Sequence, residues 1–104
     1  MNKTDYRLIR IACQYGYDAQ SRQCIEEMSE LTKAINKFWR KHLDCGKKEL
    51  SSVDFHNKEY EDIVEEIADV QIMLDQMKMF MDCEDSIYDV IEKKIDRQLE
   101  RISL

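Results

Sequence analysis

Apolar side chains recur at every third or fourth position along most of the chain. Two runs of four residues show this spacing best. They are Met28, Leu31, Ile35 and Phe38, and Ile67, Val70, Leu74 and Met77. The spacing is that of the apolar face of an α-helix, and no stretch alternates with period two for long enough to form a strand. We therefore predict an all-α protein.

The first half of the chain is predicted to hold two helices separated by a glycine. The first covers about residues 5–15, with Thr4 as a candidate N-cap and Gly16 as its end. Asp18 is the expected N-cap of a long second helix that reaches about His42. The inward face of the first helix is expected to consist of Leu8, Ile11, Ala12 and Tyr15.

The second half is predicted to hold two more helices. Residues 44–57 are polar and contain Gly46, so we expect an irregular stretch there. A third helix is expected from residue 57 or 58 to about 81, and a fourth from Ser86 to Ser103 after a polar break. Residues 1–104 are expected to form one all-α domain, with the helices packed as a four-helix bundle.

Composition narrows the possible functions. A net charge of −6 argues against general nucleic-acid binding, which needs a basic surface. No stretch approaches the roughly 18 apolar residues of a membrane span, and no signal-peptide pattern follows Met1. We therefore expect a cytoplasmic protein that binds neither nucleic acid nor membranes. Its four cysteines are expected to be reduced and mostly buried, as is usual for a cytosolic protein, and their spacing gives little support to a zinc site.

A short acidic pattern occurs twice, 39 positions apart. The copies read Glu26-Glu27-Met28-Ser29-Glu30-Leu31 and Glu65-Glu66-Ile67-Ala68-Asp69-Val70. Within each copy, acids three positions apart share a helix face beside the apolar stripe, and none has Lys or Arg at i+4. If the two helices face each other, four carboxylates converge and repel unless a cation lies among them. These are Glu27, Glu30, Glu66 and Asp69. The pattern favours a metal site over a solvated acidic face.

The ligand type indicates which metal. Carboxylate oxygens suit Mg²⁺, Mn²⁺ or Ca²⁺, whereas zinc and iron sites usually include His or Cys. His42 and His56 lie near a helix end and in the irregular stretch, where we expect solvated, structural roles. The sequence contains no Asp-rich loop with a central Gly, which is the pattern of a calcium-binding loop. Mg²⁺ with open positions for water and phosphate fits best, and Mn²⁺ is a possible substitute.

Basic residues on the predicted last helix supply the opposite charge. Lys94, Arg97 and Arg101 share one face, beside the apolar Ile91 and Ile95. They either form ion pairs with neighbouring acids near the helix C-terminus or bind phosphate close to the metal. Carboxylates for Mg²⁺ together with cations for phosphate are what a nucleoside triphosphate site requires.

The order of these motifs resembles the MazG-like all-α nucleoside triphosphate pyrophosphohydrolases. The resemblance covers about residues 15–102 and consists of Glu26-Glu27-x-x-Glu30, then Glu66-x-x-Asp69, then the basic helix. It implies a helical bundle that forms dimers or tetramers and hydrolyses an NTP or dNTP to the monophosphate and pyrophosphate. The implied Mg²⁺ ligands are Glu27, Glu30, Glu66 and Asp69. Glu26 or Glu65 would orient or deprotonate water, and Lys94, Arg97 and Arg101 would contact phosphates.

The sequence departs from that family in two places, and two other classes of function are also compatible with it. The interval between the acidic motifs is longer than in compact members, and Lys94-Ile95-Asp96-Arg97 stands where some members have Asn. A non-catalytic helical module that binds a nucleotide or a protein is the main alternative, and a metal buffer or sensor is another. Trp39 either stacks on a nucleobase or packs in a core or interface. The sequence does not indicate which base or sugar is preferred.

Overall fold

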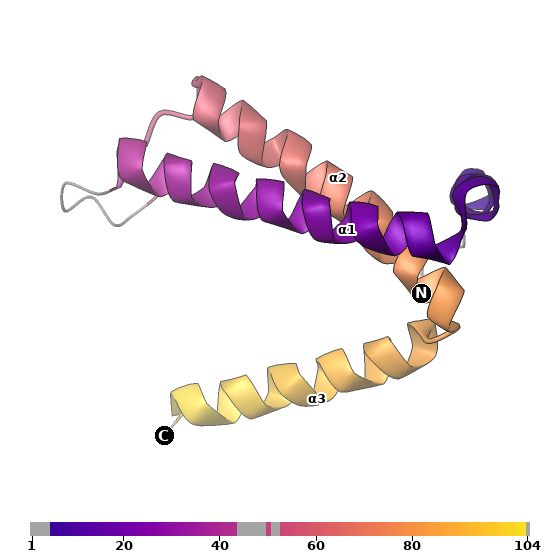
Figure 1. Cartoon of the computed structure of the whole chain (residues 1–104). Coiled ribbons are helices and arrows are strands. Elements are labelled where there is room, and N and C mark those ends of the chain that lie inside the picture. The colour runs from indigo at the N-terminus through magenta and orange to yellow at the C-terminus, as the bar shows by residue number, and fades with distance from the viewer. Residues whose placement is uncertain (1–4, 44–49, 51–52, 104) are drawn as a thin grey trace.

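The computed structural model describes residues 5–43, 50 and 53–103. Three helices account for most of them: α1 (Tyr6–His42), α2 (Lys58–Met81) and α3 (Glu84–Ser103) (Figure 1). The described ranges contain no strand, so the all-α prediction is confirmed. Most of the predicted irregular stretch, at residues 44–49 and 51–52, lies outside the described residues.

α1 contains both helices that were predicted for the first half of the chain. Thr4 lies outside the described residues, and the N-cap is Asp5, whose carboxylate accepts a hydrogen bond from the Arg7 backbone N–H at 2.9 Å. Gly16 interrupts the helix with φ 84° and ψ 165°, a conformation open almost only to glycine. The predicted break at Gly16 is therefore confirmed. The predicted cap Asp18 was wrong, because a single residue leaves the helical conformation and α1 continues through Asp18.

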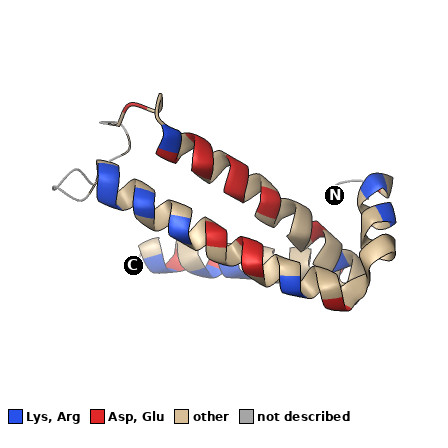
Figure 2. Cartoon of the chain, turned by 45° about the horizontal axis from the view of Figure 1, so that its top comes forward, with Lys and Arg blue, Asp and Glu red and all other residues tan. Residues whose placement is uncertain are grey.

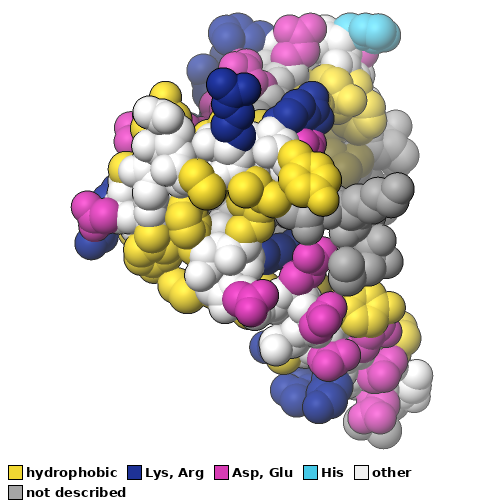
Figure 3. All heavy atoms as spheres, turned by 90° about the vertical axis from the view of Figure 1, so that its right-hand side faces the viewer, with side chains coloured by type: hydrophobic (Ala, Val, Ile, Leu, Met, Phe, Trp, Pro, Cys, Tyr) yellow, Lys and Arg dark blue, Asp and Glu magenta, His cyan; other side chains and the backbone are white. Residues whose placement is uncertain are grey.

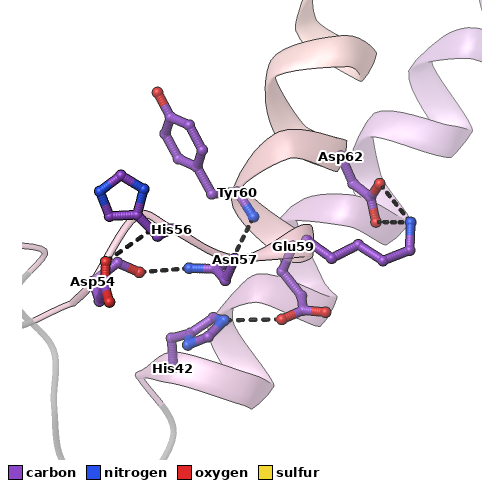
Figure 4. Close-up of polar contacts among 8 residues, drawn as sticks. His42, Asp54, His56, Asn57, Glu59, Tyr60 and Asp62 are labelled. Carbon is purple, nitrogen blue, oxygen red and sulfur yellow. Dashed lines mark hydrogen bonds and ion pairs between the residues drawn. The ribbon is translucent and has the colours of Figure 1, made fainter.

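α2 has the predicted bounds and packs against α1 as an antiparallel hairpin (Figure 1). Its N-cap Asn57 accepts a hydrogen bond from the Tyr60 backbone N–H at 2.7 Å. Beside this cap, the His42 ring at the end of α1 lies 3.1 Å from a Glu59 carboxylate oxygen (Figure 4). The hydrogen bond with His42 is the main reason why the pKa of Glu59 is lowered. The contact joins the two helices at the end of the hairpin that is farther from Gly16.

α3 begins two residues before the predicted Ser86. Asp82 adopts the left-handed conformation, with φ 49°, and ends α2. The chain reverses direction at Asp82, and α3 follows after one more residue. In its first turn the Ile87 N–H donates a hydrogen bond to the Cys83 carbonyl at 2.9 Å. α3 then runs away from the hairpin and, within the described residues, makes hardly any contact with α1 or α2 (Figure 1). Within residues 5–43, 50 and 53–103 the predicted four-helix bundle is therefore not formed, because the α3 residues from 88 to 103 are all exposed.

The contact between α1 and α2 is formed by residues that were only partly predicted. We call these residues the seam, and they are buried or half-buried. They are Gln20, Cys24, Glu27, Leu31 and Phe38 of α1, and Glu66, Asp69, Val70, Met73 and Gln76 of α2.

Half of the residues of the predicted apolar stripe are exposed. Met28, Ile35, Ile67 and Leu74 are 41%, 50%, 49% and 38% exposed. The predicted inward residues Ile11 and Tyr15 are exposed as well, whereas Ala12 is buried. The prediction was wrong because each helix carries two adjacent apolar faces, and the hairpin buries only one of them.

The described cysteines are free thiols, but they are not mostly buried. Cys24 is buried in the seam, and this burial raises the pKa of its thiol. Cys83 is half-buried and Cys13 is exposed, so the expected burial was wrong for Cys13. Cys45 lies outside the described residues. No helix within the described ranges is both long enough and apolar enough to cross a membrane.

A single chain has an open shape with much exposed apolar surface. Its accessible surface is 8575 Å², about 2,400 Å² more than a compact monomer of this mass has. Its radius of gyration is 17.1 Å, whereas a compact domain of this length has about 13 Å. Figure 3 shows hydrophobic side chains grouped on the surface at the N-terminal side of α1.

Candidate metal centre

Three carboxylates of the repeated acidic pattern converge midway along the hairpin. Glu27 of α1 and Glu66 and Asp69 of α2 each offer an oxygen, and these oxygens lie within 4.8 Å of one another. We call these three residues the acid cluster. Figure 2 shows acidic residues in the middle of α1 beside a row of acidic residues on α2. Since all three are seam positions, helix packing itself brings the negative charges together.

Glu66 occupies the most unusual environment of the three. Its Oε2 atom is buried and has no hydrogen-bond partner among the described residues. Burial raises the pKa of Glu66 above its usual value, and the nearby charges of Asp69 and Glu27 raise it further. A buried acceptor oxygen without a donor is costly. A bound cation would remove this cost.

Gln23 orients one of the three acids. Its side-chain amide donates a hydrogen bond to Glu27 Oε1 at 2.7 Å, one helical turn away. An outer partner of this kind fixes the direction in which a ligating carboxylate points. The role of Gln23 was not predicted, although the i, i+4 spacing of Gln and Glu on one helix could have indicated it.

Glu30, the fourth predicted ligand, lies at the rim of the acid cluster. It is exposed, and its Oε1 atom lies 3.4 Å from the Lys33 ammonium. Its charge still contributes to the raised pKa of Glu66, so the two side chains are near each other. Three positions turn a helix by about 300°, which places Glu30 about 60° around α1 from Glu27 and outside the seam. Lys33 stands at i+3 from Glu30, whereas the predicted lack of a basic partner was based on the i+4 positions alone.

The predicted water-activating acids, Glu26 and Glu65, do not belong to the acid cluster. Both side chains are exposed. Each precedes a cluster residue by one position, which places it about 100° around its helix. The charge of Glu65 adds to the raised pKa of Glu66, so Glu65 lies near enough to act on the site electrostatically.

The predicted phosphate contacts are separated from the acid cluster within one chain. Lys94, Arg97 and Arg101 lie on α3 and are exposed to solvent. None of the three forms an ion pair within the described part of the chain. Because α3 does not pack on the hairpin, a single chain does not complete the expected combination of acids and cations.

Other candidate residues have roles different from those expected. His42 is half-buried, hydrogen-bonded to Glu59 and packed on the Phe38 ring at 4.8 Å, so the prediction that it is solvated was wrong. His56 is exposed, as expected. Trp39 is 45% exposed, and both interpretations of it stay predictions.

A pocket of about 480 Å³ lies between the first part of α1, before Gly16, and the C-terminal end of α2. Its lining includes Ala12 and Cys13 of α1 and Lys78 and Phe80 of α2. It shares no described residue with the acid cluster. The pocket is therefore separate from the candidate metal centre.

The donor set of the acid cluster suits a hard cation. All three ligands are carboxylate oxygens, and no His or Cys stands among them. Oxygens bound to one Mg²⁺ at about 2.1 Å lie about 3.0–4.2 Å apart, so side-chain movements of about 1 Å would suffice. Three protein ligands leave coordination positions for water and phosphate.

Comparisons of the chain with models of known protein families, with curated proteins and with solved structures find no match. The resemblance to the MazG-like enzymes therefore stays a prediction.

Proposed function

We propose that this protein is a Mg²⁺-dependent nucleoside triphosphate pyrophosphohydrolase, with Mn²⁺ as a possible substitute. The observation that supports this function best is the acid cluster. It holds three half-buried carboxylates within 4.8 Å, one of them with a buried oxygen that lacks a donor among the described residues. The order of motifs in the sequence supplies the reaction type.

The proposed roles follow the positions of the side chains. Glu27, Glu66 and Asp69 would hold the metal, with Glu30 at the rim available to a second ion. The metal would lower the pKa of a bound water and stabilise charge on the phosphoryl oxygens. Glu26 or Glu65 would orient or deprotonate the water that attacks the α-phosphorus. The bond from that phosphorus to the bridging oxygen would break, with pyrophosphate as the leaving group.

We further propose that the active form is a homodimer or homotetramer. One chain exposes about 2,400 Å² more surface than a compact monomer of its mass, and obligate dimer interfaces bury about 2,000–5,000 Å² in total. The apolar faces of the hairpin and of α3 both lack a cover within the described chain. The residues concerned are Met28, Ile35, Trp39, Ile67 and Leu74 of the hairpin, and Tyr88, Ile91, Ile95 and Leu99 of α3.

Association of copies would also supply phosphate ligands. α3 carries Lys94, Arg97 and Arg101 and hardly contacts the hairpin of the same chain. These residues would therefore approach an acid cluster through packing between copies. Sedimentation equilibrium tests this step. We expect a mass two or four times 12.5 kDa for the native chain, and a shift towards the monomer for Leu99→Glu. Lys93→Glu, on the same exposed helix, is the matched control and should leave the mass unchanged.

The activity itself is tested with a panel of NTPs and dNTPs. Each nucleotide is incubated with the protein and Mg²⁺ or Mn²⁺, and the release of pyrophosphate is measured. Glu27→Gln and Asp69→Asn should abolish turnover while the helical circular dichroism stays intact. Glu61→Gln, an exposed acid of α2 outside the acid cluster, is the control. Absence of pyrophosphate release across the panel with both metals would refute the proposed reaction.

One observation favours the alternative of a non-catalytic nucleotide- or protein-binding module. The basic residues of α3 and the acid cluster lie on elements that hardly touch within the described chain. Calorimetry with Mg²⁺ and a non-hydrolysable NTP distinguishes the two functions. The enzyme should bind the nucleotide only with metal present, whereas binding without any metal requirement favours the module.

A further inference from the structure

Two buried glutamines pair across the seam of the hairpin. The Gln20 amide nitrogen donates to the Gln76 side-chain oxygen at 2.8 Å. Gln20 is 8% exposed and Gln76 only 1%, and Gln76 is the largest fully buried side chain in the described chain. The Gln76 amide nitrogen also approaches the Ile72 carbonyl at 3.5 Å. Such deep burial of a polar amide is tolerated because its partner lies opposite.

The glutamine pair stands one heptad away from the acid cluster on both helices. Gln20 precedes Glu27 by seven residues, and Gln76 follows Asp69 by seven residues. Because α1 and α2 run antiparallel, these two steps lead in the same direction along the seam. The register that joins Gln20 to Gln76 is therefore the register that sets Glu27 opposite Asp69.

His42 and Glu59 form another polar contact between the helices, at the far end of the hairpin. Around the glutamine pair the other buried residues are apolar, among them Cys24, Val70 and Met73, and apolar contacts exchange partners at smaller cost than a buried hydrogen bond. In a shifted register each glutamine would face apolar groups and lose its partner, which is costly for a buried amide. One turn of sliding moves a helix by about 5.4 Å, which exceeds the 4.8 Å within which the carboxylate oxygens lie. A single-turn slip would thus disperse the acid cluster.

We infer that Gln20 and Gln76 are positioning residues, whose hydrogen bond selects the one helix register in which Glu27, Glu66 and Asp69 converge. Paired polar residues in an otherwise apolar helix contact select register in coiled coils in the same way. The inference rests on the proposed metal centre for its consequence, but the register itself is measured without any metal.

The test replaces both amides by apolar side chains of similar shape. Gln20→Met/Gln76→Met removes the hydrogen bond without leaving either partner unpaired, and Gln20→Leu/Gln76→Leu is the second variant should the first fail to fold. Met73→Leu, an exchange between apolar residues in the same seam, is the matched control. Circular dichroism and thermal unfolding establish that each variant is folded.

The register is read as a distance between two nitroxide labels. The labels are attached at Arg22→Cys and Glu61→Cys, two exposed positions on α1 and α2 that lie far apart along the hairpin axis, after the other reactive cysteines are replaced by serine. Double electron–electron resonance should give one distance for the native pair and for Met73→Leu. The double variant should add a second population about 5 Å away, corresponding to one helical turn.

The consequence for the acid cluster is read as Mn²⁺ affinity by calorimetry, in the protein without labels. We expect at least a tenfold loss for the double variant while its melting temperature is unchanged or higher, a combination that general destabilisation would not produce. One unchanged distance overturns the inference, and so does Mn²⁺ affinity equal to that of the native chain. If the native chain binds no Mn²⁺, the proposed function fails and the distance alone decides whether the glutamines set the register.

Discussion

Metal binding should stabilise the native chain by an amount that depends on Glu27. Acids held together in the folded hairpin bind the cation, and the unfolded chain does not hold them together. Metal at 100 times its Kd then adds about 2.7 kcal/mol to the free energy of unfolding. For a chain of about 100 residues this raises the melting temperature by about 10–20 °C. Glu27→Gln removes one of the three carboxylates within 4.8 Å.

Loss of the Glu27 carboxylate should weaken metal binding at least as much as loss of a residue that only hydrogen-bonds to a ligand. Losing such a residue lowers metal affinity by up to about 100-fold. The same metal concentration would then equal the new Kd and contribute only about 0.4 kcal/mol, or about 2–3 °C. The assay is thermal unfolding by circular dichroism in EDTA and in graded Mg²⁺. Glu61→Gln should keep the full native shift. Equal shifts for Glu27→Gln and the native chain would refute the assignment of Glu27 as a ligand.

Three further predictions concern the surroundings of the site. Because the pKa of Glu66 is raised, the folded state holds its proton more tightly than the unfolded state, so the metal-free chain should lose stability as pH rises from 4.5. Melting curves in EDTA should show that the native chain loses stability with rising pH while Glu66→Gln does not. A stability difference between the two proteins that stays constant with pH would contradict this prediction. Gln23→Leu should weaken Mn²⁺ binding about 10–100-fold, because Glu27 loses the donor that orients its carboxylate. Calorimetry measures this affinity, and an affinity equal to that of the native chain would contradict the role of Gln23. Gly16→Ala should lower the free energy of unfolding in urea by about 1–3 kcal/mol, because the backbone conformation at residue 16 suits only glycine. The added methyl group would meet no atom within 4 Å, so the cost comes from the backbone alone. An unchanged urea midpoint would mean that α1 can continue as a straight helix through residue 16.

Helix positions were predictable from local chemistry. α2 begins and ends where Asn57 and Asp82 indicate, since a cap and a chain reversal depend on neighbouring residues. The contacts between helices were not predictable in the same way. Met28 and Phe38 have the same hydrophobic character in the sequence, yet Phe38 is buried in the hairpin and Met28 is exposed. A helix with two apolar faces does not reveal which face its own chain covers.

The acid cluster was largely predicted because its residues repeat at one interval. Glu27, Glu66 and Asp69 come together as expected, whereas Glu30 fell outside because the seam was rotated from the predicted stripe. The pairing of Gln20 with Gln76 was not predicted. The seven-residue steps from Gln20 to Glu27 and from Asp69 to Gln76 were visible in the sequence. Their meaning depends on the antiparallel register, which only the packed hairpin reveals.

Anomalous diffraction from crystals grown with Mn²⁺ and a non-hydrolysable NTP tests the metal centre most directly. We predict a Mn²⁺ peak between the carboxylates of Glu27, Glu66 and Asp69, with phosphate oxygens completing the coordination. Bound nucleotide with no peak among these three residues would contradict the account.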